Sequence, residues 1–180
     1  MHGFFMVQFQ RFVNDRFGAG TWEQVQQTAG LPGKSYVAVE AYSDEELGRL
    51  VAAARQVSKT PSDVLLESFG EAMVPGLIES YGGDLDPAWT TLDVILNTEA
   101  TMHTVVRRQS PGSSPPPLRA SRTSATEVRV SYASPRRLCT VARGICRGLG
   151  RHFGETIEIE EPACMLRGGR TCEIIVRRRG

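Results

Sequence analysis

The protein has 180 residues, of which 41% are hydrophobic and 23% are charged, and its net charge is +1. No apolar run approaches the roughly 20 residues that span a bilayer, so the composition excludes a membrane protein. The opening MHGFFMVQFQRF lacks the basic segment and unbroken apolar core of an export signal, and we expect a cytoplasmic protein. The length suits one domain covering residues 1–180.

The charge is unevenly distributed along the chain. Residues 1–100 contain six Lys/Arg and fourteen Asp/Glu, whereas residues 101–180 contain fifteen Arg and six Glu. A basic half can bind nucleic acid, but it can equally hold an acidic small ligand. Aromatic residues that could stack on bases are scarce there, so we expect no nucleic-acid partner.

The spacing of apolar residues and the capping residues predict helices in the first 110 residues. The predicted helices cover residues 4–17, 21–30, 44–57, 62–82 and 87–108. Pro75 lies inside the fourth helix and predicts a kink.

The proline-rich segment QSPGSSPPPLRA (109–120) then ends the helical part. ATEVRVSYASP alternates with period two, which predicts a strand with Val128, Val130 and Tyr132 on one face. RLCTVARGICRGLGRHFG is typical of a helix, and residues 156–179 predict two strands around Gly168-Gly169. The order predicts an α+β fold: an N-terminal helical part, then an antiparallel sheet of about four strands with an inserted helix.

His103 is the first candidate site residue. Leu92, Leu96, Ala100 and Val106 share its face of the fifth predicted helix, so its ring should face the interior. A core histidine bonded to a backbone carbonyl is the alternative interpretation.

Tyr132, Ser134 and Arg136 follow at spacings that place them on one face of the predicted strand. Two hydroxyls and a guanidinium suit carboxylates, such as the two propionates of haem. A solvated strand face is the alternative, but Tyr132 continues the apolar face.

At these residues the sequence resembles the H-NOX (haem nitric oxide/oxygen binding) family. Tyr132-Ala133-Ser134-Pro135-Arg136 matches its propionate-binding Tyr-x-Ser-x-Arg motif, and His103 falls where the family has its proximal iron ligand. Further matches cover essentially the whole chain: Met1-His2-Gly3, Phe17-Gly18 with Trp22, and Phe69-Gly70. The resemblance implies haem b buried between the helical part and the sheet. Pro116 matches the proline that distorts the haem, whereas Pro115 and Pro117 suit a stiff linker.

The resemblance also implies a distal pocket. Members that hold O2 have a distal tyrosine where this chain has Val141, and Phe5, Phe9, Met73 and Ile145 are the other expected pocket residues. All are apolar. Bound O2 gains from a hydrogen-bond donor whereas NO and CO bind without one, so we expect a sensor of NO and CO that excludes O2.

We expect the signal to be a movement of His103 and the haem. NO weakens the bond trans to it, so His103 would be released and the haem would relax away from Pro116. No catalytic grouping stands out, so we expect no enzyme, and the resemblance implies a separate partner, a histidine kinase or a cyclic-di-GMP enzyme.

Cys139, Cys164 and Cys172 are predicted to meet near one end of the sheet, which would suit a structural zinc. Some bacterial H-NOX proteins look like this, with three cysteines and a histidine. The position of that histidine is Glu161 here, so Glu161 or Cys146 would be the fourth ligand. Buried or redox-responsive thiols are the alternative. His2 and His152 are expected at the surface.

One competing function is a haem-free member of the same scaffold, similar to four-vinyl-reductase domains. It would bind an apolar small molecule or sense redox state through its cysteines. An arginine-rich nucleic-acid adaptor is a second rival.

Overall fold

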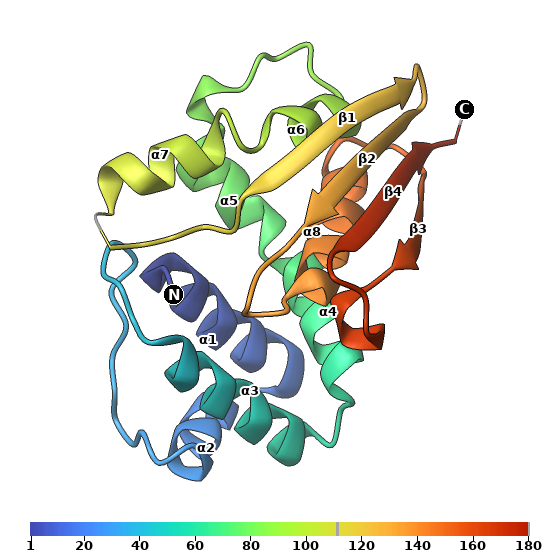
Figure 1. Ribbon diagram of the computed structural model, residues 1–180. Helices are drawn as coiled ribbons and strands as arrows, with labels where there is room; N and C mark the ends of the chain where they lie inside the picture. Colours follow the sequence, from blue (N-terminus) through green and yellow to red (C-terminus); the bar gives the residue numbers. More distant parts are fainter. Residues whose placement is uncertain (111, 180) are drawn as a thin grey trace.

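The computed structural model describes residues 1–110 and 112–179, so Pro111 of the proline-rich segment and Gly180 of the predicted domain lie outside the described residues. The first part of the chain is helical (Figure 1). Its elements are α1 (Gly3–Phe17), α2 (Thr21–Thr28), α3 (Asp44–Ser58), α4 (Ser62–Ala72), α5 (Val74–Tyr81), the 3-10 helix η1 (Gly82–Asp84), α6 (Thr91–Asn97) and α7 (Met102–Gln109).

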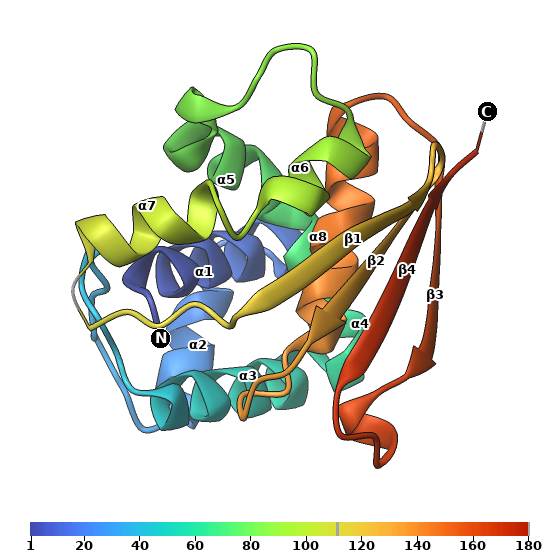
Figure 2. The ribbon, with the colours of Figure 1, turned by 45° about the horizontal axis from the view of Figure 1, so that its top comes forward.

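The second part is a sheet with one long helix inserted in its sequence. Its elements are β1 (Leu118–Ser124), β2 (Glu127–Tyr132), α8 (Cys139–His152), β3 (Ile157–Ala163), the 3-10 helix η2 (Met165–Arg167) and β4 (Cys172–Arg178). The strand order is β1-β2-β4-β3 with antiparallel pairs throughout, which confirms the predicted α+β class and strand number. Figure 2 shows the helices on one face of the sheet.

The sequence located three of these strands but not β1. Its residues LRASRTS carry no apolar alternation, and most of them are exposed. As an edge strand, β1 pairs with β2 alone and buries little, so no hydrophobic pattern is required of it. β2 has Val128, Val130 and Tyr132 buried on one face, as predicted.

The predicted 62–82 helix is interrupted near Pro75, as expected. α4 ends at Ala72 and α5 begins at Val74, with Pro75 in its first turn.

The predicted helix over residues 87–108 is wrong at its start and in its middle. Thr90 and Asp93 form a capping box, so α6 begins at Thr91. The Thr98 and Thr101 hydroxyls then bond to the backbone carbonyls four residues earlier, at 2.8 and 2.9 Å. Such back-bonding competes with the helix, and residues 98–101 form turns between α6 and α7. Ala100, predicted to be buried beside His103, is exposed.

Glycines set the packing of α4 against α8. A Cβ at Gly70 would lie 2.2 Å from the Val141 carbonyl oxygen, and one at Gly144 would lie 2.1 Å from that of Glu67. The two helices therefore touch backbone to backbone, which positions Val141 and Ile145 of α8. In the part of the chain that the structure describes, no helix is long and apolar enough to cross a membrane.

Candidate functional site

A mainly apolar cavity lies between the helical part and the sheet. Its empty volume, counted together with its opening to solvent, is about 1360 Å³. Side chains from α1, α5, α6, α7, α8, the proline-rich segment and the sheet line it. The sequence-predicted residues among them are Phe5, Met73, His103, Pro116, Arg136, Val141 and Ile145.

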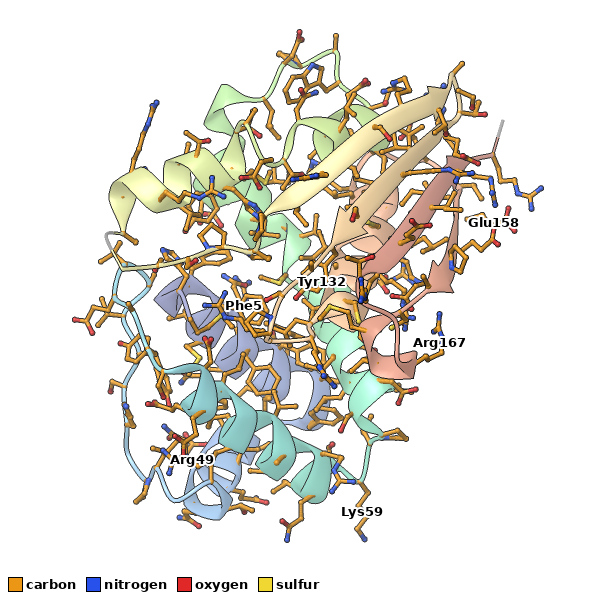
Figure 3. The ribbon with its side chains drawn as sticks, in the orientation of Figure 1. Phe5, Arg49, Lys59, Tyr132, Glu158 and Arg167 are labelled. Atoms are coloured by element: carbon orange, nitrogen blue, oxygen red, sulfur yellow. The ribbon has the colours of Figure 1, made fainter. Side chains whose placement is uncertain are left out.

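Phe9, Tyr132 and Ser134 do not line the cavity. Phe9 is fully buried and packs edge-on against Phe69 at 5.0 Å and Trp22 at 6.1 Å between ring centres. It lies one turn beyond Phe5 on α1, within the aromatic core. Figure 3 labels Phe5 on α1 and Tyr132 at the end of β2, which mark the helical and the sheet side of the molecule.

His103 lies in the first turn of α7, with 16% of its side chain exposed. Its Nδ1 lies 3.0 Å from Glu99 Oε2, which leaves Nε2 as the free ring nitrogen. Burial lowers the pKa of His103, and the hydrogen bond with Glu99 acts in the opposite direction. A neutral ring held through one nitrogen can offer the lone pair of the other to a metal.

Arg136 contributes a guanidinium to the cavity lining. Its Nε lies 2.8 Å from Asp44 Oδ1, but within the described residues this N–H is not aligned with any acceptor for a hydrogen bond. Burial raises the pKa of Asp44, but the positive charges of Arg136 and the Met1 amine beside it lower the pKa on balance. The carboxylate is thus ionised, and the guanidinium keeps donor capacity for a second anion.

Tyr132 and Ser134 stand beside Arg136 rather than on one strand face with it, because β2 ends at Tyr132. The Tyr132 hydroxyl accepts the backbone N–H of Leu138 at 3.0 Å, and the Ser134 hydroxyl accepts that of Arg136 at 3.3 Å. Burial raises the pKa of Tyr132, so its hydroxyl stays a neutral donor. The motif shapes the turn that holds Arg136, which the prediction of a continued strand missed.

His2 corrects a second expectation, since it is half-buried and lines the cavity instead of lying on the surface. Its Nε2 lies 2.7 Å from the Ser110 hydroxyl, and its ring lies 6.3 Å from that of Tyr81. Tyr81 also lines the cavity, and sequence reasoning missed it. Tyr81 closes α5, and only the helical spacing of α5 could have indicated which way it faces. His152 is exposed, as predicted.

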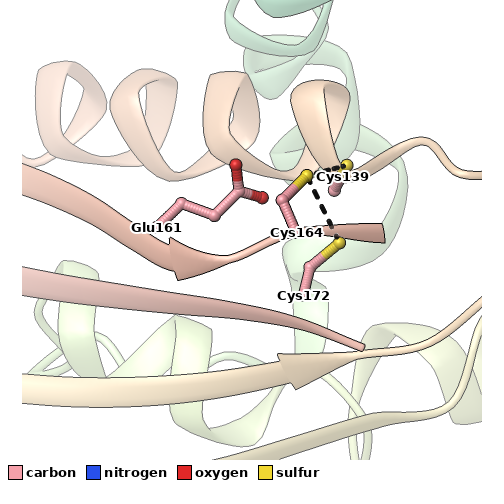
Figure 4. A group of neighbouring side chains, drawn as sticks. All are labelled: Cys139, Glu161, Cys164 and Cys172. Carbon is pink, nitrogen blue, oxygen red and sulfur yellow. Dashed lines mark hydrogen bonds between the residues drawn. The ribbon is translucent and has the colours of Figure 1, made fainter. Parts of the chain in front are cut away.

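The predicted cysteine cluster forms where α8, β3 and β4 meet. Cys139 and Cys164 sulfurs are 3.6 Å apart, and those of Cys164 and Cys172 are 3.8 Å apart (Figure 4). Glu161 joins them, and ligand atoms of the four residues lie within 4.8 Å of one another. Cys146 lies elsewhere, in the cavity wall.

The carboxylate of Glu161 is divided between two environments. Its Oε2 accepts hydrogen bonds from Arg143 at 2.8 Å and from Arg167 at 3.2 Å. Its Oε1 is buried and has no hydrogen-bond partner among the described residues. A buried, unpartnered carboxylate oxygen beside three thiols is a donor set that fits a cation. Burial raises the pKa of Cys139 to about 12, so without a cation this thiol stays protonated.

Comparisons with known proteins agree with this architecture. A model of the haem-NO-binding (HNOB) family matches residues 2–161. An H-NOX protein from S. oneidensis in the Fe(II)NO state superposes with a TM-score of 0.92 at 23% identity, over 100% of each chain. The unliganded Fe(II) H-NOX protein from K. algicida gives 0.85 at 21% identity, over 100% of this chain and 97% of that one.

Among curated proteins, soluble guanylate cyclase gcy-31 of Caenorhabditis elegans is 22% identical over 138 residues. The match takes in 76% of this chain but only 20% of the cyclase, so the chain spans about a fifth of that relative.

A helical part and an antiparallel sheet around an apolar cavity, with a histidine and an arginine in its wall, are the architecture of H-NOX domains, and the family match places this chain in that class of haem-based gas sensors. The chain belongs to the haem-NO-binding family, whose members bind gas ligands and signal to partner proteins.

Proposed function

We propose that residues 1–180 form one cytoplasmic sensor domain that binds NO and CO at haem b and excludes O2. The observation that carries this proposal is that one apolar cavity contains both the free ring nitrogen of His103 and the guanidinium of Arg136. His103 would hold the iron, and Arg136, with Tyr132 and Ser134 beside it, would hold the propionates. Pro116, in the cavity wall, would press on the haem face.

We assign the selectivity for NO and CO over O2 to the apolar part of the cavity wall, formed by Phe5, Met73, Val141 and Ile145. Haem bound in the cavity would supply the iron to which the gas binds, and these side chains would offer the gas no hydrogen-bond donor. Tyr81 also lines the cavity, and its phenol could donate a hydrogen bond to bound O2, so Tyr81 is the residue to test.

The gas test uses the purified ferrous protein and its visible spectrum under NO, CO and O2. We expect stable complexes with NO and CO and none with O2, and Tyr81→Phe should change none of these results. A stable O2 complex that Tyr81→Phe abolishes would overturn the selectivity.

The haem test compares His103→Gly with His152→Gly, because His152 is exposed and serves as a matched control. The His103→Gly protein should lose the bond between a protein side chain and the iron, and added imidazole should then take the place of that side chain as the ligand. A protein that takes up no haem on reconstitution would instead support the haem-free scaffold.

The signal would leave through α7, because His103 lies in its first turn. Release of the ring would free this short helix, and a histidine kinase or a cyclic-di-GMP enzyme would respond. If His103→Gly leaves the partner's NO response unchanged, this route is wrong.

We further propose a structural zinc bound by Cys139, Cys164, Cys172 and Glu161. The unpartnered Glu161 Oε1 supports Glu161 over Cys146 as the fourth ligand. Three thiolates and a carboxylate would carry four negative charges, and Arg143 and Arg167 already lie against Glu161.

Metal analysis of the purified protein should give about one zinc per chain on this reasoning. Glu161→Gln should weaken zinc retention against a chelator, whereas Cys146→Ala should leave it unchanged. Loss of zinc in Cys146→Ala with retention in Glu161→Gln would reverse the assignment, and a metal-free protein would favour redox-responsive thiols.

A further inference from the structure

Glu99 contacts His103 from outside the cavity and uses both of its carboxylate oxygens. Oε2 lies 3.0 Å from His103 Nδ1 and accepts the backbone N–H of Leu118, also at 3.0 Å. Oε1 accepts from Arg107 Nη2 at 2.5 Å. Three parts of the molecule therefore meet at one carboxylate: the turn after α6, helix α7 and the start of β1.

The contact with His103 fixes the tautomer of the ring. A carboxylate is an acceptor, so the proton sits on Nδ1 and the lone pair sits on Nε2. Negative charge on the Nδ1 side also makes Nε2 a stronger donor to a metal, as carboxylates behind metal-bound histidines do. The orientation and the electronic character of the ring thus both depend on Glu99.

The carboxylate is itself well anchored. The Leu118 N–H and the Arg107 guanidinium both donate to it, which holds the carboxylate in place. Leu118 directly follows the Pro115–Pro117 run, and both Leu118 and Pro116 line the cavity. A displacement of the His103 ring would therefore pull on Leu118 and on the segment before it that contains Pro116.

We propose that Glu99 is a positioning residue that sets the strength of the bond between His103 and the haem iron. This inference rests on the proposed role of His103 as the axial ligand. A charged pair at positions i and i+4 is also a common structural feature of helices, worth only about 0.3–0.5 kcal/mol at a surface. A positioning role changes the bond between His103 and the iron, whereas a purely structural ion pair does not.

The test compares Glu99→Gln and Glu99→Leu with the wild-type ferrous haem protein. Gln keeps the length and an acceptor oxygen but removes the charge, and Leu removes the acceptor. Glu158→Gln is the matched control, because Glu158 pairs with Arg179 at 2.7 Å on the outer sheet and does not line the cavity.

The main readout is the iron–histidine stretching band in resonance Raman spectra. We expect its frequency to fall in the order wild type, Glu99→Gln, Glu99→Leu, and the midpoint potential of the haem to rise in the same order. Transfer of haem to an acceptor apoprotein should become about tenfold faster in Glu99→Leu, the lower end of what loss of such a partner costs. Circular dichroism should show that all variants fold alike.

The outcomes separate the two proposals. A band that stays in place in both Glu99 variants overturns the positioning role and leaves His103 as the ligand. No iron–histidine band in the wild-type protein overturns the ligand assignment itself. A shift of equal size in Glu158→Gln would show a general charge effect and would also overturn the inference.

Discussion

The crossing of α4 and α8 predicts that Gly144→Ala destabilises the protein. The new methyl carbon would lie 2.1 Å from the Glu67 carbonyl oxygen, and the obstacle is backbone rather than a flexible side chain. The helices must part by roughly 1 Å or more to reach an ordinary contact. Alanine gains about 1 kcal/mol of helix propensity over glycine, whereas overpacking costs about 3 kcal/mol at the upper end of its usual range. We expect a net loss of about 2 kcal/mol, or about 4–8 °C in Tm for a chain of this length.

Gly48→Ala provides the matched control, because Gly48 lies within α3, is exposed, and a Cβ there would meet nothing within 4 Å. It should stabilise the protein by about 0.5–1 kcal/mol. Both variants are followed by thermal and urea unfolding of haem-free and haem-loaded samples, since a ligand bound only by the folded state raises apparent stability. A Gly144→Ala protein as stable as the wild type would refute the backbone contact at this crossing.

Three further predictions follow from the site and the helix starts. Arg136→Leu should speed haem loss, whereas Arg137→Leu, at the exposed neighbouring residue, should not, because of these two arginines only Arg136 lines the cavity. The rate of haem transfer to an acceptor apoprotein measures this. Thr90→Ala removes the capping box of α6 and should cost about 1 kcal/mol in urea unfolding. In the folded, metal-free protein, burial raises the pKa of the Cys139 thiol from an ordinary value of 9.0 to about 12. Its stabilising contribution is therefore complete below pH 9 and should be lost between pH 9 and 12, and Cys139→Ala should flatten that decline.

The sequence predicted those elements that bury a periodic face or carry a clear cap. The Ser43 hydroxyl accepts the Glu46 N–H at 3.1 Å, as the predicted start of α3 requires. β1 escaped prediction because an exposed edge strand needs no apolar alternation. The helix over residues 87–108 was too long because its apolar spacing continued through threonines whose hydroxyls bond to the backbone.

The residues that line the cavity could be predicted where a motif specified them, but not where packing between distant segments decided. His103, Pro116 and Arg136 line the cavity as expected, but Phe9 turns into the aromatic core one helical turn from Phe5. His2 and Tyr81 reach the cavity through contacts between distant segments, such as the bridge of His2 with Ala41. No local pattern in one sequence encodes such contacts.

The break between α6 and α7 bears on how a signal could start. A continuous helix through His103 would tie the ring to α6, whose Leu92 and Val94 are buried. Instead α7 has eight residues, begins at Met102 and has Met102 as its one buried residue. An isolated helix of that length is marginal in water. Its order therefore depends on its contacts, and one of them is the Glu99 carboxylate, which links His103 to Leu118 at the start of β1. On the proposed release of His103, the turn that the threonines form at residues 98–101 would therefore let α7 move separately from α6.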